Sequence, residues 1–84
     1  MANTSAREIQ QSFGARLREV RRRKGLSQEQ LALRSELDRS FVGQVERGER
    51  NISLTNIYKL ARGLGVTPNS LFEPSKRDGA RSDP

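Results

Sequence analysis

The sequence predicts an all-α protein, a compact bundle of five short helices. Its 84 residues suffice for one small domain, and because only 32% of them are apolar, the core must be compact and helical. Apolar residues recur at helical spacing along the chain, and no stretch alternates as a half-buried strand does. We expect a flexible N-terminus over residues 1–8, a folded domain over residues 9–73 and a disordered polar tail over residues 74–84.

The first predicted helix carries apolar residues at helical spacing, which are Ile9, Phe13, Leu17 and Val20. It continues to about Lys24, and Gly25 ends it. A second helix follows over about residues 28–35, because Ser27 can cap its N-terminus and Gln30 can complete a capping box.

A third helix follows after a tight turn. Asp38 can cap its N-terminus, and Gly48 supplies its C-terminal stop. Glu36 stands at the turn itself, where a left-handed conformation costs a non-glycine residue about 1 kcal/mol. Two short helices joined in this way form a helix-turn-helix motif.

Two more helices complete the predicted bundle. Ser53 can cap a fourth helix, which ends at Gly63 and Gly65. Its apolar stripe consists of Leu54, Ile57, Leu60, Ala61 and Leu64. A fifth helix begins at Thr67 and Pro68, because proline is favoured at the first helical position.

Composition limits the function. The chain has no cysteine or histidine, which excludes disulfides, zinc sites of the usual kind and imidazole chemistry. No paired carboxylates and no glycine-rich phosphate loop occur, so we expect neither an enzyme nor a cofactor or small-molecule ligand. No apolar run is long enough for a signal peptide or a membrane span, so we expect a cytoplasmic protein without a membrane partner.

The net charge is +6, and its placement suits a polyanion. The charges after Phe72 cancel, so the whole excess lies in residues 1–72. Phosphate neutralisation by such a basic domain supplies non-specific affinity for nucleic acid.

The third helix has the chemistry of a helix that reads DNA bases. If Val42 and Val45 point into the core, the opposite side of this helix is polar and basic. That outward side contains Arg39, Ser40, Gly43, Gln44 and Arg47. Arginine suits the O6 and N7 atoms of guanine and glutamine suits adenine, so Arg39, Ser40 and Gln44 are the predicted base readers. An ordinary solvated helix surface is the alternative.

Glycine at position 43 adds to this interpretation. Glycine in a helix interior is less stable than alanine by about 1 kcal/mol, so it is expected where another group approaches the helix closely. We therefore include Gly43 among the base-contacting residues, although a small residue without a role is the alternative.

Several runs of this sequence resemble one known family. They are residues 25–32 (GLSQEQLA), the group Asp38, Arg39, Ser40 and Val42, and the group Val45, Glu46, Arg47, Gly48, Arg50 and Asn51. Over about residues 9–72 the chain is similar to the helix-turn-helix regulators of the phage repressor and Cro family, also called the xenobiotic response element family. Residues 37–54 are most similar to controller proteins of restriction-modification systems.

The resemblance implies a lambda repressor-like DNA-binding domain and further site residues. It adds Phe41 as an apolar base contact. It also implies that Gln28 contacts a phosphate, which agrees with its place at a helix N-terminus. Arg50 and Asn51, together with Arg47, are expected to contact phosphates beside the groove. A structural ion pair between Arg21 and Glu46 is implied as well.

A homodimer is expected, because one such module buries too little surface for high specificity, whereas a two-fold dimer reads both halves of an inverted repeat. The candidate dimer interface consists of Ile52, Leu64, Leu71 and Phe72; the alternative is that these residues form the core. The sequence thus predicts a transcriptional regulator of double-stranded DNA that could control a restriction-modification operon. An antitoxin or coactivator-like protein-interaction module, with DNA binding secondary, is the competing hypothesis.

Overall fold

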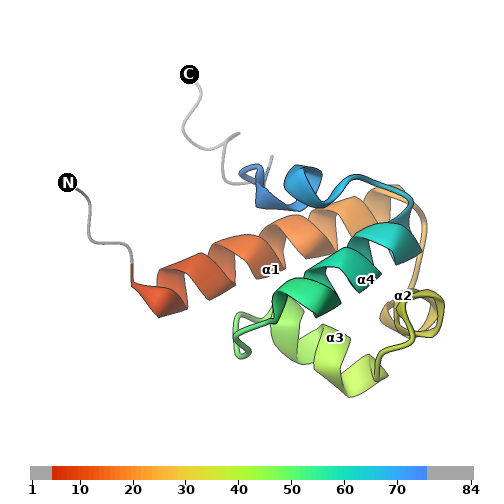
Figure 1. The fold of residues 1–84 in the computed structure, drawn as a ribbon, viewed down its shortest axis with the longest axis horizontal. Helices are drawn as coiled ribbons and strands as arrows, with labels where there is room; N and C mark the ends of the chain where they lie inside the picture. The colour runs from red at the N-terminus through yellow and green to blue at the C-terminus, as the bar shows by residue number, and fades with distance from the viewer. Residues whose placement is uncertain (1–4, 76–84) are drawn as a thin grey trace.

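The computed structural model describes residues 5–75 and contains only helices within that range, which confirms the all-α prediction (Figure 1). The elements are α1 (Ala6–Arg23), α2 (Gln28–Ser35), α3 (Arg39–Glu46), α4 (Leu54–Leu64) and the 3-10 helix η1 (Pro68–Phe72). Residues 1–4 of the expected flexible N-terminus and residues 76–84 of the expected tail lie outside the described residues. No helix of residues 5–75 combines the length and apolar character that a membrane span requires.

Helix α1 begins earlier than its apolar pattern predicted. Ser5 is its N-cap: the Ser5 Oγ accepts a hydrogen bond from the Glu8 backbone N at 3.1 Å, and Glu8 Oε1 accepts one from the Ser5 backbone N at 3.0 Å. This capping box satisfies two backbone donors and extends the helix into the segment expected to be flexible. Ile9 is 56% exposed, so the buried side of α1 starts at Phe13.

The helix-turn-helix forms by the predicted capping, with one difference. The Gln30 backbone N donates to Ser27 Oγ at 3.0 Å, and the Ser27 backbone N donates to Gln30 Oε1 at 2.8 Å. Glu36 has a left-handed backbone with φ 58°. Asp38 occupies the N-cap of α3 with extended backbone angles, but its side chain makes no capping hydrogen bond. Gly48, with φ +76°, follows the end of α3.

The fifth predicted helix is a 3-10 helix instead of an α-helix. The element has only five residues, and Glu73 has an extended backbone because it precedes Pro74, whose ring disfavours the helical conformation of the residue before it. Short 3-10 turns are common at such positions.

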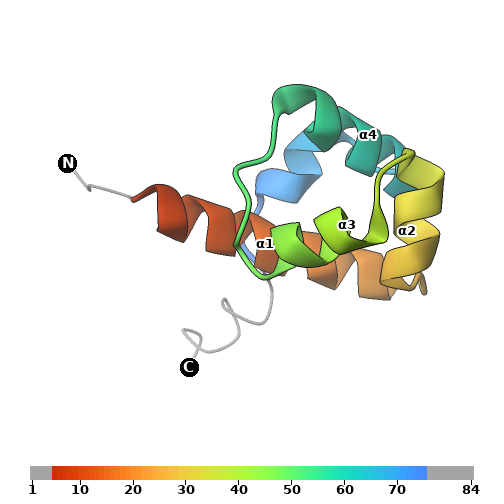
Figure 2. The same cartoon turned by 90° about the horizontal axis from the view of Figure 1, so that it is seen from below.

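α1 lies between η1 on one side and α3 on the other (Figure 1). Seen from below, α3 lies in front of α1, and α2 stands at one end of the pair (Figure 2). The core between the helices consists of Phe13, Leu17, Val20, Leu31, Ala32, Val42, Val45, Ile57, Leu60, Ala61, Leu64 and Leu71.

Two residues assigned to the dimer interface belong to this core. Leu64 is 2% exposed and Leu71 is 0% exposed within one chain. Leu64 lies on α4 and Leu71 on η1, and these two elements pack against each other. Both side chains are therefore buried within one chain and cannot contact a second copy. Ile52 is half-buried, whereas Phe72 is 61% exposed.

An arginine that the sequence did not single out fixes η1 against α1. Arg16 is buried, and its Nε donates to the Ser70 carbonyl oxygen at 2.8 Å. Its two terminal nitrogens contact Glu19 at 2.9 Å and Glu73 at 3.1 Å. The guanidinium therefore satisfies groups from both elements and holds the C-terminal segment in place.

Helices approach closely at two glycines. At Gly14 of α1, a Cβ atom would overlap the Val45 carbonyl oxygen and lie 2.6 Å from that of Glu46. At Gly63 of α4, a Cβ atom would overlap Ser35 Oγ. This hydroxyl is buried and has no hydrogen-bond partner among the described residues. Ser35 is buried at this contact, and its small side chain allows α2 and α4 to approach each other closely.

Candidate nucleic-acid interface

A buried ion pair anchors α3 to α1. Arg21 Nε lies 2.6 Å from Glu46 Oε2, and Arg21 Nη2 donates to Glu46 Oε1 at 3.0 Å. The two side chains are 9% and 2% exposed. Arg21 Nη1 also donates to the Leu26 carbonyl oxygen at 2.8 Å, just before α2. The structure thus contains the ion pair that the family resemblance implies, and this pair joins α1, α3 and the approach to α2.

Gln28 extends this cluster from the first residue of α2. Its Nε2 donates to Glu46 Oε1 at 3.0 Å. The amide is therefore fixed beside α3 at the N-terminus of α2, where free backbone donors favour an anion. In this structure the side chain is bound to Glu46, and a phosphate at this place would meet an amide that is already oriented.

Gly43 has a different environment from the one the sequence suggested. It is buried, and a Cβ atom there would lie 3.2 Å from Arg47 Nη1 and 3.5 Å from Gln28 Oε1. The groups that approach Gly43 closely are the ends of these two side chains. Gly43 therefore shares a helix face with Arg39 and Arg47, and the side chains of Arg47 and Gln28 cover it.

The remaining predicted base readers gather at the exposed side of α3. Arg39 and Ser40, in its first turn, are exposed, and Gln44, one turn further, is half-buried. Phe41 is half-buried and packs partly against the core. The Arg50 guanidinium carbon stands 5.2 Å from the centre of the Phe41 ring, which couples the loop after α3 to this helix by a cation–π contact.

The loop after α3 carries the predicted phosphate contacts and one acidic partner. Arg50 and Asn51 are exposed. Arg47 contacts Glu49 through two hydrogen bonds of 3.0 and 3.2 Å. The hydrogen bond from Arg47 lowers the pKa of Glu49 below its ordinary value, and the same contact raises the pKa of Arg47. A phosphate would compete with Glu49 for Arg47. The spacing of these residues in the sequence does not predict the Arg47–Glu49 ion pair.

A helix-turn-helix with exposed polar and basic side chains on its second helix defines a class of protein, the DNA-binding regulators of this fold. Residues 17–71 match the model of the HTH_3 family, described as helix-turn-helix. The chain belongs to this family of DNA-binding transcriptional regulators.

Similar proteins include control proteins of restriction-modification systems. Control protein C.MunI of Mycoplasma sp is 39% identical over 72 residues, which cover 84% of this chain and 97% of the relative. Control protein C.BamHI of Bacillus amyloliquefaciens is 44% identical over 62 residues, covering 73% and 76%. The crystal structure of the restriction-modification controller protein C.AhdI from Aeromonas hydrophila has 62% identity and a TM-score of 0.74, and covers 75% of this chain and 96% of that one.

Proposed function

We propose that this protein binds an inverted repeat in double-stranded DNA as a homodimer and thereby controls a restriction-modification operon. The observation that carries the proposal is the exposed N-terminal turn of α3, with Arg39 and Ser40 free of the core. The N-terminal part of a recognition helix is the part that meets base edges in the major groove. The operon is proposed from the similarity to control proteins.

The proposed contacts divide into two groups. Arg39, Ser40 and Gln44 read bases, with Phe41 as an apolar contact to a thymine methyl group. The residues around them position the protein on the phosphates, and these are Gln28, Arg47, Arg50 and Asn51. The buried Arg21–Glu46 pair keeps both groups in a fixed arrangement.

Replacement of Arg39 by alanine is expected to weaken binding to the specific site by about 1–3 kcal/mol and to relax preference at one base pair of each half-site, because alanine cannot make the bidentate hydrogen bond to a base. Selection from random duplexes with the wild-type protein gives the site, and fluorescence anisotropy against all single-base substitutions gives the preference. Arg34→Ala is the matched control, since Arg34 is an exposed arginine on α2. An Arg39→Ala profile identical to that of the wild type would show that Arg39 does not read a base.

The proposed dimer uses an apolar surface formed by Ile9, Ile52 and Phe72, called here the Phe72 surface. Ile9 and Phe72 are 56% and 61% exposed. A hollow of about 300 Å³ lies between them, and core residues such as Phe13 form part of its floor. A small domain gains stability by covering such a surface. A second copy would cover it symmetrically, and dimers of this class read two half-sites about 34 Å apart.

The Phe72→Glu variant is expected to be a folded monomer that binds a single half-site and the full inverted repeat with similar affinity. Its side chain is exposed, so a charge there blocks association without entering the core. Sedimentation equilibrium at tens of micromolar measures the mass, and circular dichroism checks the fold. Leu33→Glu is the control, because Leu33 is 76% exposed on α2. A wild-type mass near 9.5 kDa without DNA, together with a complex that holds one chain per operator duplex, would refute the dimer.

A further inference from the structure

Helix α1 carries a second basic surface beside the recognition helix. Successive residues of an α-helix are about 100° apart, so Arg7, Arg18 and Arg22 fall within about 60° of one another around α1. All three are exposed. We call them the α1 arginine row, and over their 15 residue steps the row is about 22 Å long.

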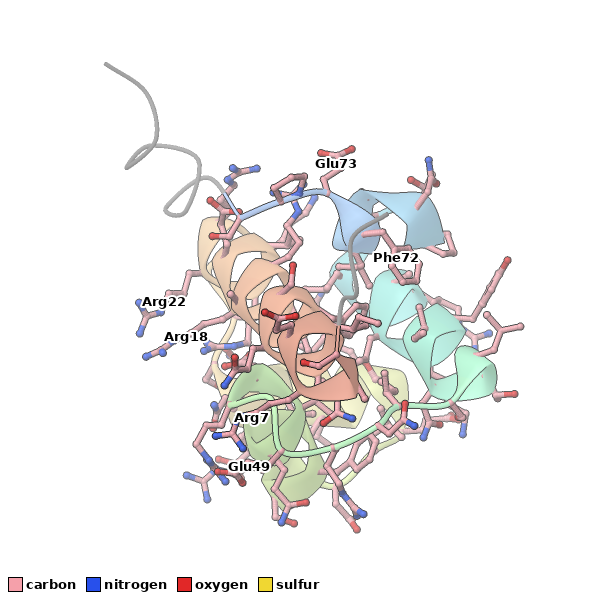
Figure 3. The ribbon with its side chains drawn as sticks, turned by 90° about the vertical axis from the view of Figure 1, so that its left-hand side faces the viewer. Arg7, Arg18, Arg22, Glu49, Phe72 and Glu73 are labelled. Atoms are coloured by element: carbon pink, nitrogen blue, oxygen red, sulfur yellow. The ribbon has the colours of Figure 1, made fainter. Side chains whose placement is uncertain are left out.

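The row lies next to the contact between α1 and α3. Gly14, where α1 touches the backbone of Val45 and Glu46, is about 40° around the helix from Arg18. The row is therefore turned slightly away from α3 and runs along its flank. In Figure 3, Arg18 and Arg22 extend away from the bundle on one side and Phe72 lies on the other. A dimer formed through the Phe72 surface would leave the row exposed.

The charges of Arg18 and Arg22 are not neutralised within the part of the chain that the structure describes. The ion pairs of α1 join Glu19 to Arg16 and Arg23, Glu73 to Arg16, and Arg21 to Glu46. Arg18 and Arg22 stand one helical turn apart, and like charges at this spacing slightly destabilise a helix. The helix dipole favours Arg22 in the last turn, but Arg18 lies before that turn. Folding stability alone does not account for this pair.

We propose that the α1 arginine row binds phosphates of duplex DNA outside the bases that α3 reads. The inference rests on the proposed DNA binding and extends it to the backbone flanking each half-site. A helix in the major groove has a phosphate strand on either side, and α1 runs beside α3 on one of those sides (Figures 2 and 3). Flexible arginine side chains on that flank suit phosphates, which give affinity without base preference.

The test compares two double variants that each remove two positive charges. Arg18→Gln/Arg22→Gln changes the row, whereas Arg34→Gln/Arg62→Gln changes exposed arginines on α2 and α4. Binding to a long mixed-sequence duplex is measured over a series of salt concentrations. In the first variant the slope of log K against log salt should shrink by about 0.9 for each phosphate that a subunit no longer neutralises, and in the second it should stay unchanged. Equal slopes for the wild type and the row variant, equal decreases in both variants, or a wild type that binds no duplex would each overturn the proposal.

A second measurement separates this inference from the proposed function. Duplexes carrying the inverted repeat selected by the wild-type protein are prepared with short and with long flanks. The row variant should keep the base preference of the wild type and lose the affinity that long flanks add. Flank-dependent binding without any selected sequence would instead support the row and refute the sequence-specific regulator. An unchanged gain from long flanks in the row variant would overturn the row even if the regulator is correct.

Discussion

Replacement of Glu46 by alanine is expected to lower the free energy of unfolding by about 3–5 kcal/mol, a large fraction of the stability of a small domain. The carboxylate accepts hydrogen bonds from Arg21 and Gln28, and its side chain is only 2% exposed. Its removal leaves the Arg21 guanidinium buried without a counter-charge. Urea denaturation followed by circular dichroism measures the decrease.

The double variant Arg21→Met/Glu46→Leu is the matched control. It removes both charges together, so no unpaired ion stays buried, and replacement of a buried pair by apolar residues is often neutral or stabilising. We therefore expect it to recover most of the stability that Glu46→Ala removes. If the free energy of unfolding of Glu46→Ala lay within about 1 kcal/mol of the wild-type value, the Arg21–Glu46 pair would not be the anchor of α3.

The helix-turn-helix could be predicted from the sequence because its signals are local. Ser27 and Gln30 form the capping box that their spacing indicates, and Gly48 follows the end of α3. The left-handed conformation of Glu36 is also predictable, since the turn requires that conformation whatever residue occupies it. The same kind of signal, a serine followed three residues later by glutamate, occurs at Ser5 and starts α1, where the apolar pattern alone placed the helix too late.

The features that sequence could not predict depend on contacts between distant segments. An apolar stripe shows which residues are buried but not whether the same chain or a second copy buries them. Leu64 and Leu71 are buried within one chain. Gly43 is a place of close approach, as its position in a helix indicates, but the neighbours are Gln28 and Arg47. The Arg47–Glu49 contact and the role of Arg16 likewise depend on side-chain positions that spacing does not reveal.

Gly14 is the clearest contact of this kind, and its replacement by alanine is expected to be the second large effect. Alanine favours a helix interior by about 1 kcal/mol over glycine. Against this gain, the new Cβ would collide with the carbonyl oxygens of Val45 and Glu46, which are backbone atoms and cannot turn aside. Overpacking of this kind costs about 3 kcal/mol or more at its upper end, so the collision outweighs the propensity and α3 must move away from α1.

Gly43→Ala is the matched control, because it also places alanine inside a helix. There the Cβ would meet only the ends of the Gln28 and Arg47 side chains, at 3.5 and 3.2 Å. Those ends can shift, so we expect Gly43→Ala to be as stable as the wild type or up to about 1 kcal/mol more stable. Gly14→Ala should instead unfold at a lower urea concentration and weaken operator binding, because the displaced α3 carries Arg39 and Ser40 out of register with the bases that we propose they contact. Measured denaturation midpoints in the reverse order would show that the backbone contact at Gly14 does not set the position of α3.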